Sequence, residues 1–213
     1  MKPYFYTMRN YTTLLFSLFT LALFGQEYHF DYIENFEIKG VYSTTFNSKE
    51  TLFVNSQDDS YILKIHSGNR AFIYDYKKER LHHLTLLKTG HEEYEFKYVK
   101  SENFLPWNKI KNVYANITSN RENVYLIQDY KSKKRQKSND YTVVLEEAPF
   151  TSLYISVEIP ARKILFFRNL LKDNSPKEKN FVIKEYTCND PYGTFISRLT
   201  DYEKTELVIK IPK

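Results

Sequence analysis

The chain has 213 residues and a formal net charge of +5, and it is rich in Tyr and Phe (19 and 16) but poor in Gly and Pro (5 and 7). This composition excludes a disordered, collagen-like or linker-rich protein and favours strands over helices. The single cysteine, Cys188, excludes an internal disulfide framework.

The first 25 residues predict a secretory signal peptide. Two positive charges, Lys2 and Arg9, precede an almost wholly apolar run at 11–24, and Gly25 follows it. This order is typical of a cleaved export signal, and the run is shorter than the roughly 20 residues that span a membrane. We expect cleavage after Gly25; the alternatives are a cut after Ala22, an uncleaved signal anchor and a buried core helix.

The mature chain, residues 26–213, is predicted to be a single exported domain, periplasmic or extracellular. Secreted eukaryotic domains of this size usually carry disulfides, so export combined with a lone thiol indicates a bacterial envelope or secreted protein. Without the first 25 residues, 29 basic residues (31 minus 2) face 26 acidic ones, which gives +3. This small excess does not favour nucleic acid as a partner, and no later stretch is apolar and long enough to span a membrane.

Residues 51–100 predict an antiparallel meander, and residues 36–46 predict one or two strands before it. Short apolar runs recur every 10 or 11 residues, separated by polar turn sequences; they lie at 51–55, 61–66, 70–76, 81–87 and 93–100. In the last run Tyr94, Phe96 and Tyr98 alternate with charged residues, which is typical of a half-buried strand.

The regular spacing of apolar runs ends after residue 100. Residues 101–120 contain Pro106 and Trp107 and predict a loop followed by a short helix near 108–118. Residues 162–174 fit both the spacing of a helix and a buried strand. Further strands are predicted at 123–130, 141–147, 152–160, 181–187 and 206–211, with a loop at 131–140.

The predicted fold is therefore mainly β. About ten short antiparallel strands form a meander that is a curved sheet, an open barrel or a sandwich, with one or two short helices. A transmembrane barrel is disfavoured, because its strands need roughly 9–11 residues and most of these runs have fewer.

The residues that most often carry chemistry form no recognisable motif. His82 and His83 are adjacent in a strand and point to opposite faces, and His66 with His83 would supply only two ligands where a transition-metal site usually needs three or four. Three acidic pairs lie at turns or strand ends, where solvated carboxylates are common: Asp58–Asp59, Glu92–Glu93 and Glu146–Glu147. We predict no catalytic residue, cofactor or metal.

Two candidate binding features remain. One is a basic loop that could hold a polyanionic partner such as lipid headgroups; its cations are Lys131, Lys133, Lys134, Arg135 and Lys137. The other is Trp107, which could line the mouth of a ligand site. The structural alternatives are a solvated hairpin tip for the loop and a plug at the end of the sheet for Trp107.

Two classes of function are compatible with these patterns. The crowding of inward positions with Tyr, Phe, Ile and Leu favours a filled core, and hence a non-enzymatic binding or interaction protein of the bacterial envelope. Its partner would be an envelope protein, a glycan or a lipid. The alternative is a periplasmic carrier of a lipid or other apolar ligand on a concave antiparallel sheet, which requires an apolar cavity.

The meander at 51–100, in an exported domain of this size, resembles that of the periplasmic lipoprotein carriers in its spacing. Such a resemblance implies a curved sheet that holds an apolar ligand against its concave face. Those carriers typically open with a helix, which residues 27–36 do not predict, so we assign the chain to no family.

Overall fold

The computed structural model describes residues 25–42, 44–66, 68–88, 94–103, 114–130, 137–155, 161–190 and 192–212. The chain divides into two compact units. The smaller unit comprises Met1–His29 and Val208–Lys213, and the larger unit comprises Phe30–Leu207.

The described residues form eleven strands and one helix, α2 (Ala161–Asn174). The strands are β1 (Gln26–Val41), β2 (Thr45–Val54), β3 (Tyr61–His66), β4 (Arg70–Asp75), β5 (Arg80–Lys88), β6 (Glu95–Asn103), β7 (Tyr114–Arg121), β8 (Val124–Tyr130), β9 (Lys137–Glu147), β10 (Phe181–Asp190) and β11 (Gly193–Ile211).

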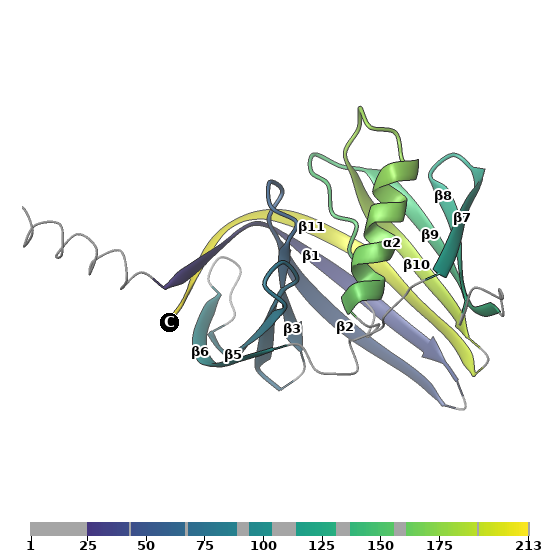
Figure 1. Cartoon of the computed structure of the whole chain (residues 1–213). Helices are drawn as coiled ribbons and strands as arrows, with labels where there is room; N and C mark the ends of the chain where they lie inside the picture. The colour runs from purple at the N-terminus through teal and green to yellow at the C-terminus, as the bar shows by residue number, and fades with distance from the viewer. Residues whose placement is uncertain are drawn as a thin grey trace, which may run out of the picture. The chain divides into compact units, whose positions relative to one another are not determined.

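All eleven strands belong to one open sheet, in the order β6-β5-β4-β3-β2-β1-β11-β10-β9-β8-β7 (Figure 1). From β1 the chain meanders outward to β6 at one edge. It resumes at the opposite edge with β7 and meanders back to β11, which lies beside β1. The predicted mainly β fold, an antiparallel meander, is confirmed. Of the three forms predicted for it, the structure has the curved sheet, which is open and does not close into a barrel.

The predicted meander over 51–100 is also confirmed strand by strand. Leu63 of β3 is in register with Phe53 of β2 and with Ile73 of β4. The ring of Phe53 meets Tyr94 and Phe96 edge-on, at centroid distances of 4.8 and 5.9 Å. Because β6 lies four strands away from β2 in the sheet, this contact shows that the sheet curls here around an aromatic core.

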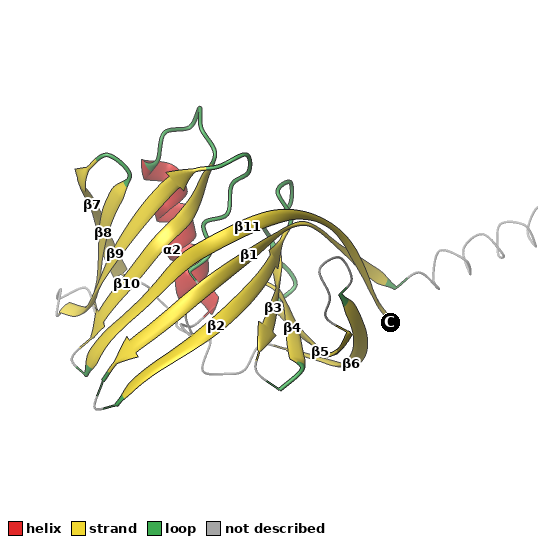
Figure 2. Ribbon diagram, turned by 180° about the vertical axis from the view of Figure 1, so that it is seen from behind, coloured by secondary structure: helices red, strands yellow, loops and turns green. Residues whose placement is uncertain are grey.

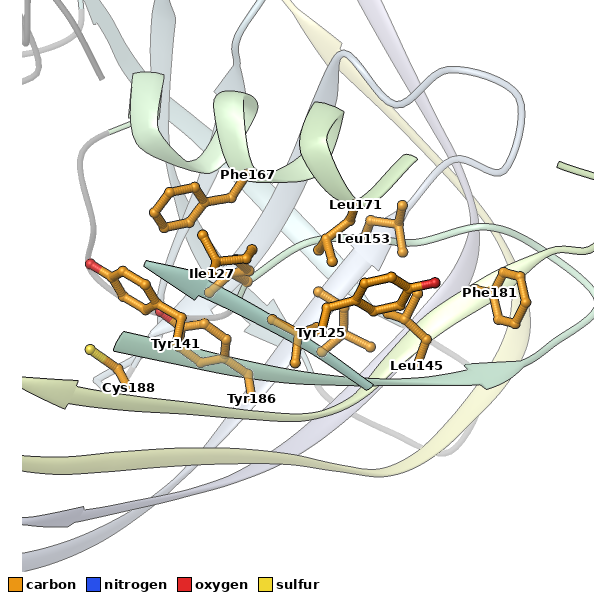
Figure 3. Packing of buried hydrophobic residues seen from close by; sticks show 13 residues of the cluster. Tyr125, Ile127, Tyr141, Leu145, Leu153, Phe167, Leu171, Phe181, Tyr186 and Cys188 are labelled. Atoms are coloured by element: carbon orange, nitrogen blue, oxygen red, sulfur yellow. The ribbon is translucent and has the colours of Figure 1, made fainter. Parts of the chain in front are cut away.

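Helix α2 packs against the other face of the sheet (Figure 2). Ile164, Phe167 and Leu171 are buried and follow helical spacing, so they form one apolar stripe. Figure 3 shows Phe167 and Leu171 pointing from the helix toward the side chains of β8 and β9, where the Phe167 and Tyr141 rings lie 4.9 Å apart. The ambiguity over residues 162–174 is thus resolved as a helix.

Several predicted boundaries were wrong. The helix expected near 108–118 is contradicted from residue 114 on, where β7 begins; residues 104–113 lie outside the described part. The loop expected at 131–140 ends earlier, because β9 begins at Lys137. Of the strand expected at 152–160, residues 152–155 form only an isolated bridge between Ser152 and Val182; residues 156–160 lie outside the described part.

Two strands are much longer than expected. β1 has 16 residues, and no strand was predicted for the first ten of them. β11 has 19 residues, of which only 206–211 were predicted as a strand. In β11 polar residues occupy both faces, with exposed and half-buried positions interleaved. The alternation that identifies a half-buried strand is therefore weak over most of its length.

Candidate functional site

The structure leaves the two predicted binding features largely untested. Trp107 and the cations Lys131, Lys133, Lys134 and Arg135 lie outside the described residues. Lys137 is the first residue of β9, where it is paired with Tyr130, the last residue of β8. The structure thus fixes the two points between which the basic loop runs.

His66 and His83, the two histidines considered as a ligand pair, lie on strands β3 and β5. The ring of Phe72 lies between His66 and His83, with centroid distances of 4.9 Å to each, so these two do not converge on one metal. His83 instead bonds Glu102 (2.9 Å), and burial lowers the pKa of His66 to about 4. Among the described residues, no group of three or more His, Cys, Asp or Glu is placed to hold a metal ion.

A half-buried cation at the first helical turn holds α2 to β8 and β9. Lys163 forms an ion pair with Asp129, whose side chain is 2% exposed. The Tyr141 hydroxyl donates to the same carboxylate (3.2 Å), and the backbone N–H of Asn139 donates to its other oxygen (2.8 Å). The Asp129 charge is therefore compensated by three donors although it is withdrawn from water.

A second cation holds α2 to the turn between β2 and β3. Arg168 donates to the Tyr154 hydroxyl (3.0 Å) and to the backbone carbonyl of Asp59, and its guanidinium lies over the Tyr154 ring at 5.5 Å. The same carbonyl accepts the Tyr154 hydroxyl proton. Asp59, a member of the acidic pair Asp58–Asp59, therefore helps to hold α2 in place through its backbone carbonyl.

Another buried carboxyl group belongs to strand β1. Glu34 of β1 is 1% exposed and accepts a hydrogen bond from the Ser152 hydroxyl (2.8 Å). Tyr32 and Phe36, which alternate with Glu34 along β1, are buried in an apolar cluster with Leu52, the residue paired with Glu34 across the sheet. Burial raises the pKa of Glu34 to about 8, so the neutral acid is the favoured form at pH 7.

A group of exposed hydrophobic residues lies where the β1–β2 and β10–β11 turns meet. We call Val41, Tyr42, Phe46, Tyr192 and Phe195 the hairpin end. The Phe46 ring lies 6.4 Å from both Tyr42 and Phe195, yet 42% of the residue remains exposed, as does 44% of Val41 and 84% of Tyr192.

Two glycines allow this close approach. A Cβ on Gly193 would lie 2.4 Å from the carbonyl oxygen of Val41, so the β10–β11 turn packs directly on the backbone of the β1–β2 turn. A Cβ on Gly40 would lie 2.0 Å from the ring of Phe46, which therefore covers bare backbone. Residues about 150 positions apart in sequence thus form one surface.

A hollow of about 730 Å³ adjoins the hairpin end on the same strands. Its lining includes Glu37, Lys39, Asn47, Lys49, Ile196 and Arg198. Arg198 is held by two bonds to Glu185 (2.7 and 2.9 Å). Lys39, Lys49 and Glu37 are exposed. Sequence reasoning missed this site; the aromatic residues flanking the polar turn in VYSTTF are its one local signal.

The buried Glu34 carboxyl predicts a pH-dependent stability. Because the pKa of Glu34 is raised in the folded state from 4.5 to about 8, its contribution is greatest below pH 4.5 and is lost as the pH rises toward 8. Glu34→Gln keeps an oxygen for Ser152 but cannot ionise, so urea denaturation should show a smaller loss of stability between pH 5 and 8 than in the parent. Glu37→Gln, at an exposed position of the same strand, should leave the loss unchanged; equal pH slopes for all three proteins would contradict this assignment.

The Lys163–Asp129 pair predicts a large loss on removing one partner. Lys163→Met leaves a buried charge without its cation and should lower the free energy of unfolding by about 3–5 kcal/mol. Lys172→Met, in the same helix but exposed, should cost less than about 1 kcal/mol. Adding Asp129→Asn to Lys163→Met should recover part of the loss in a double-mutant cycle, and strictly additive effects would refute the pair.

Comparisons with known proteins identify no family. No protein-family profile matches the chain, and no curated protein is similar to it. One similar solved structure is a LolA superfamily protein from Nitrosomonas europaea; the match has 5% sequence identity, covers 83% of this chain and 87% of that chain, and has a TM-score of 0.36. At this TM-score the two folds differ too much for a functional property to be transferred.

Proposed function

We propose that this protein is a non-enzymatic binding protein exported to the bacterial envelope, and that the hairpin end is its contact surface. One observation carries the proposal. Of the six large hydrophobic residues exposed in the described part of the chain, three (Val41, Phe46 and Tyr192) gather at this one place from two distant segments. Apolar patches that persist on a folded surface commonly mark interaction sites.

The polar groups support binding rather than catalysis. Asp129, Lys163 and Arg168 are each engaged in holding α2 against the sheet, and Glu34 bonds Ser152 within the apolar cluster. None of these groups lines the hollow beside the hairpin end. The exposed aromatic residues, flanked by charged side chains, match the anatomy of a binding patch.

Export is the part of this proposal that rests on sequence alone. Cleavage after Gly25 would leave Gln26, the first residue of β1, so the mature chain would retain every strand. Among the described residues, no helix is both long enough and apolar enough to cross a membrane. The basic loop at 131–137 would remain in the exported protein as a second contact region.

Site-specific photo-crosslinking in a bacterial host tests the contact surface. A photoreactive residue at position 46 or 192 should give crosslinked products, because both positions lie on the hairpin end. The same residue at Leu87 or Val99, which are exposed in β5 and β6, should give none. Equal crosslinking at all four positions, or none at 46 and 192, would overturn the choice of surface.

The carrier of an apolar ligand is the second candidate, favoured by the open sheet and by half-buried aromatic residues, Phe72 and Tyr74, on one face of β4. Native mass spectrometry of the exported protein, purified without detergent, separates the two functions. We expect the bare mass of residues 26–213, because the face beneath α2 is already filled by buried side chains. Extra mass that extracts into chloroform would establish the carrier instead.

A further inference from the structure

We infer that a second copy of this chain binds along the outer edge of β7, the side of the strand that faces away from β8. The two β7 strands would pair antiparallel about a two-fold axis, so that the sheet of one copy continues into the sheet of the other. This inference goes beyond the proposed function and uses a different surface from the hairpin end.

β7 is an edge strand of the sheet. It ends the strand order next to β8 (Figures 1 and 2), and within the described ranges no strand pairs with its outer edge. Residues 114–119 pair with β8 in regular register, and the first irregularity follows Ser119. Because alternate residues of an antiparallel strand direct their N–H and C=O groups away from the neighbouring strand, this stretch presents a row of backbone donors and acceptors to a further strand.

The two edges of the sheet differ in their protection against strand addition. The charged residues of β6, at the opposite edge, are Glu95, Lys97, Lys100 and Glu102. Two irregularities also interrupt the pairing of β6 with β5, and both charges and bulges on an edge strand hinder the addition of another strand. β7 has the sequence YANITSNR, which contains no proline and only one charged residue, Arg121 at its end. Along 114–119, β7 therefore lacks the protection that β6 has.

The apolar cluster beneath α2 reaches β7, where it is only half covered. Ala115 and Ile117 pack against this cluster and are half-buried. Ile127 of β8, which is paired with Ile117, is fully buried and has a paired strand on each side. A strand added beyond β7 would give Ile117 the same two neighbours. Such a strand would therefore gain apolar contact on one face as well as backbone hydrogen bonds.

A second β7 suits this edge because the strand is complementary to itself. In the register centred on Ile117, the two Ile117 side chains face each other and Ala115 faces Ser119, all on the face that carries the apolar cluster. On the other face Asn116 lies across from Thr118, and both are exposed. No like charges are opposed in this stretch, and the apolar clusters of the two copies become continuous. Two-fold dimers with such a self-complementary interface are the commonest oligomers.

Sedimentation equilibrium of residues 26–213, exported to the periplasm and purified without detergent, tests the inference. The parent should have twice the monomer mass at micromolar concentration and should dissociate on dilution. Asn116→Lys with Thr118→Lys should raise the dissociation constant by about tenfold or more, because like charges directly opposite each other across two strands are destabilising. Both positions are exposed, so the monomer should remain folded.

Oppositely charged variants separate a lost interface from a damaged fold. Asn116→Glu with Thr118→Glu should also weaken the dimer, but mixing this variant with the lysine variant should restore the dimer mass as a heterodimer. A variant that is merely misfolded would not be rescued by mixing. Val99→Lys with Asn103→Lys adds two positive charges at exposed positions of β6 and should leave the dimer unchanged.

Three results would overturn the inference. One is a monomer mass for the parent at every concentration, and another is a dimer that the β7 variants leave intact. The third is failure of the two oppositely charged variants to associate when they are mixed. If the parent is monomeric and a photoreactive residue at position 118 captures a different protein, the edge accepts a foreign strand and the second copy is the wrong occupant. Crosslinking at positions 46 and 192 tests the hairpin end independently of these results.

Discussion

The orientation of α2 on the open sheet depends on two half-buried cations. Lys163 and Arg168 are five residues apart, which places them about 140° apart around the helix axis. Ile164, Phe167 and Leu171 lie within that angle, so the apolar stripe is bounded by a cation on each flank. One cation reaches Asp129 of β8 and the other reaches the β2–β3 turn. The helix is therefore tied to strands on both sides of the central pair β1 and β11.

This arrangement divides the protein into a covered face and an uncovered end. The side chains beneath α2 are used in packing, and the buried polar groups there are used in holding the helix or, for Glu34, a neighbouring segment. Neither packing beneath α2 nor attachment of the helix explains the apolar side chains that remain exposed. Phe46 is half covered by its neighbours and rests on Gly40, which gives the exposed ring a fixed position. A rigid aromatic residue at a strand end contributes contact area at little conformational cost.

The sequence predicted those elements whose alternation is strong and local. β3 to β6 follow from short apolar runs between polar turns, and the alternation of Phe96 with charged neighbours identified the inward face correctly. The first ten residues of β1 were not predicted, because a buried acid, Glu34, interrupts the apolar face. Most of β11 was not predicted, because polar residues occupy both of its faces. The hairpin end could not be predicted at all, since it requires that Gly193 lie against Val41. The basic loop was predicted from its composition alone, and four of its five cations lie outside the described residues.

The order of the strands explains why the β1–β2 and β10–β11 turns lie at the same end of the sheet. In an antiparallel meander, alternate connections leave the sheet at the same end. The β1–β2, β8–β9 and β10–β11 connections share one end because β1 and β11 are neighbours at the centre of the sheet. If the chain ran as a single meander from β1 at one edge to β11 at the other, the first hairpin and the last would be separated by the width of the sheet. Returning β11 to the side of β1 brings the β1–β2 and β10–β11 turns together.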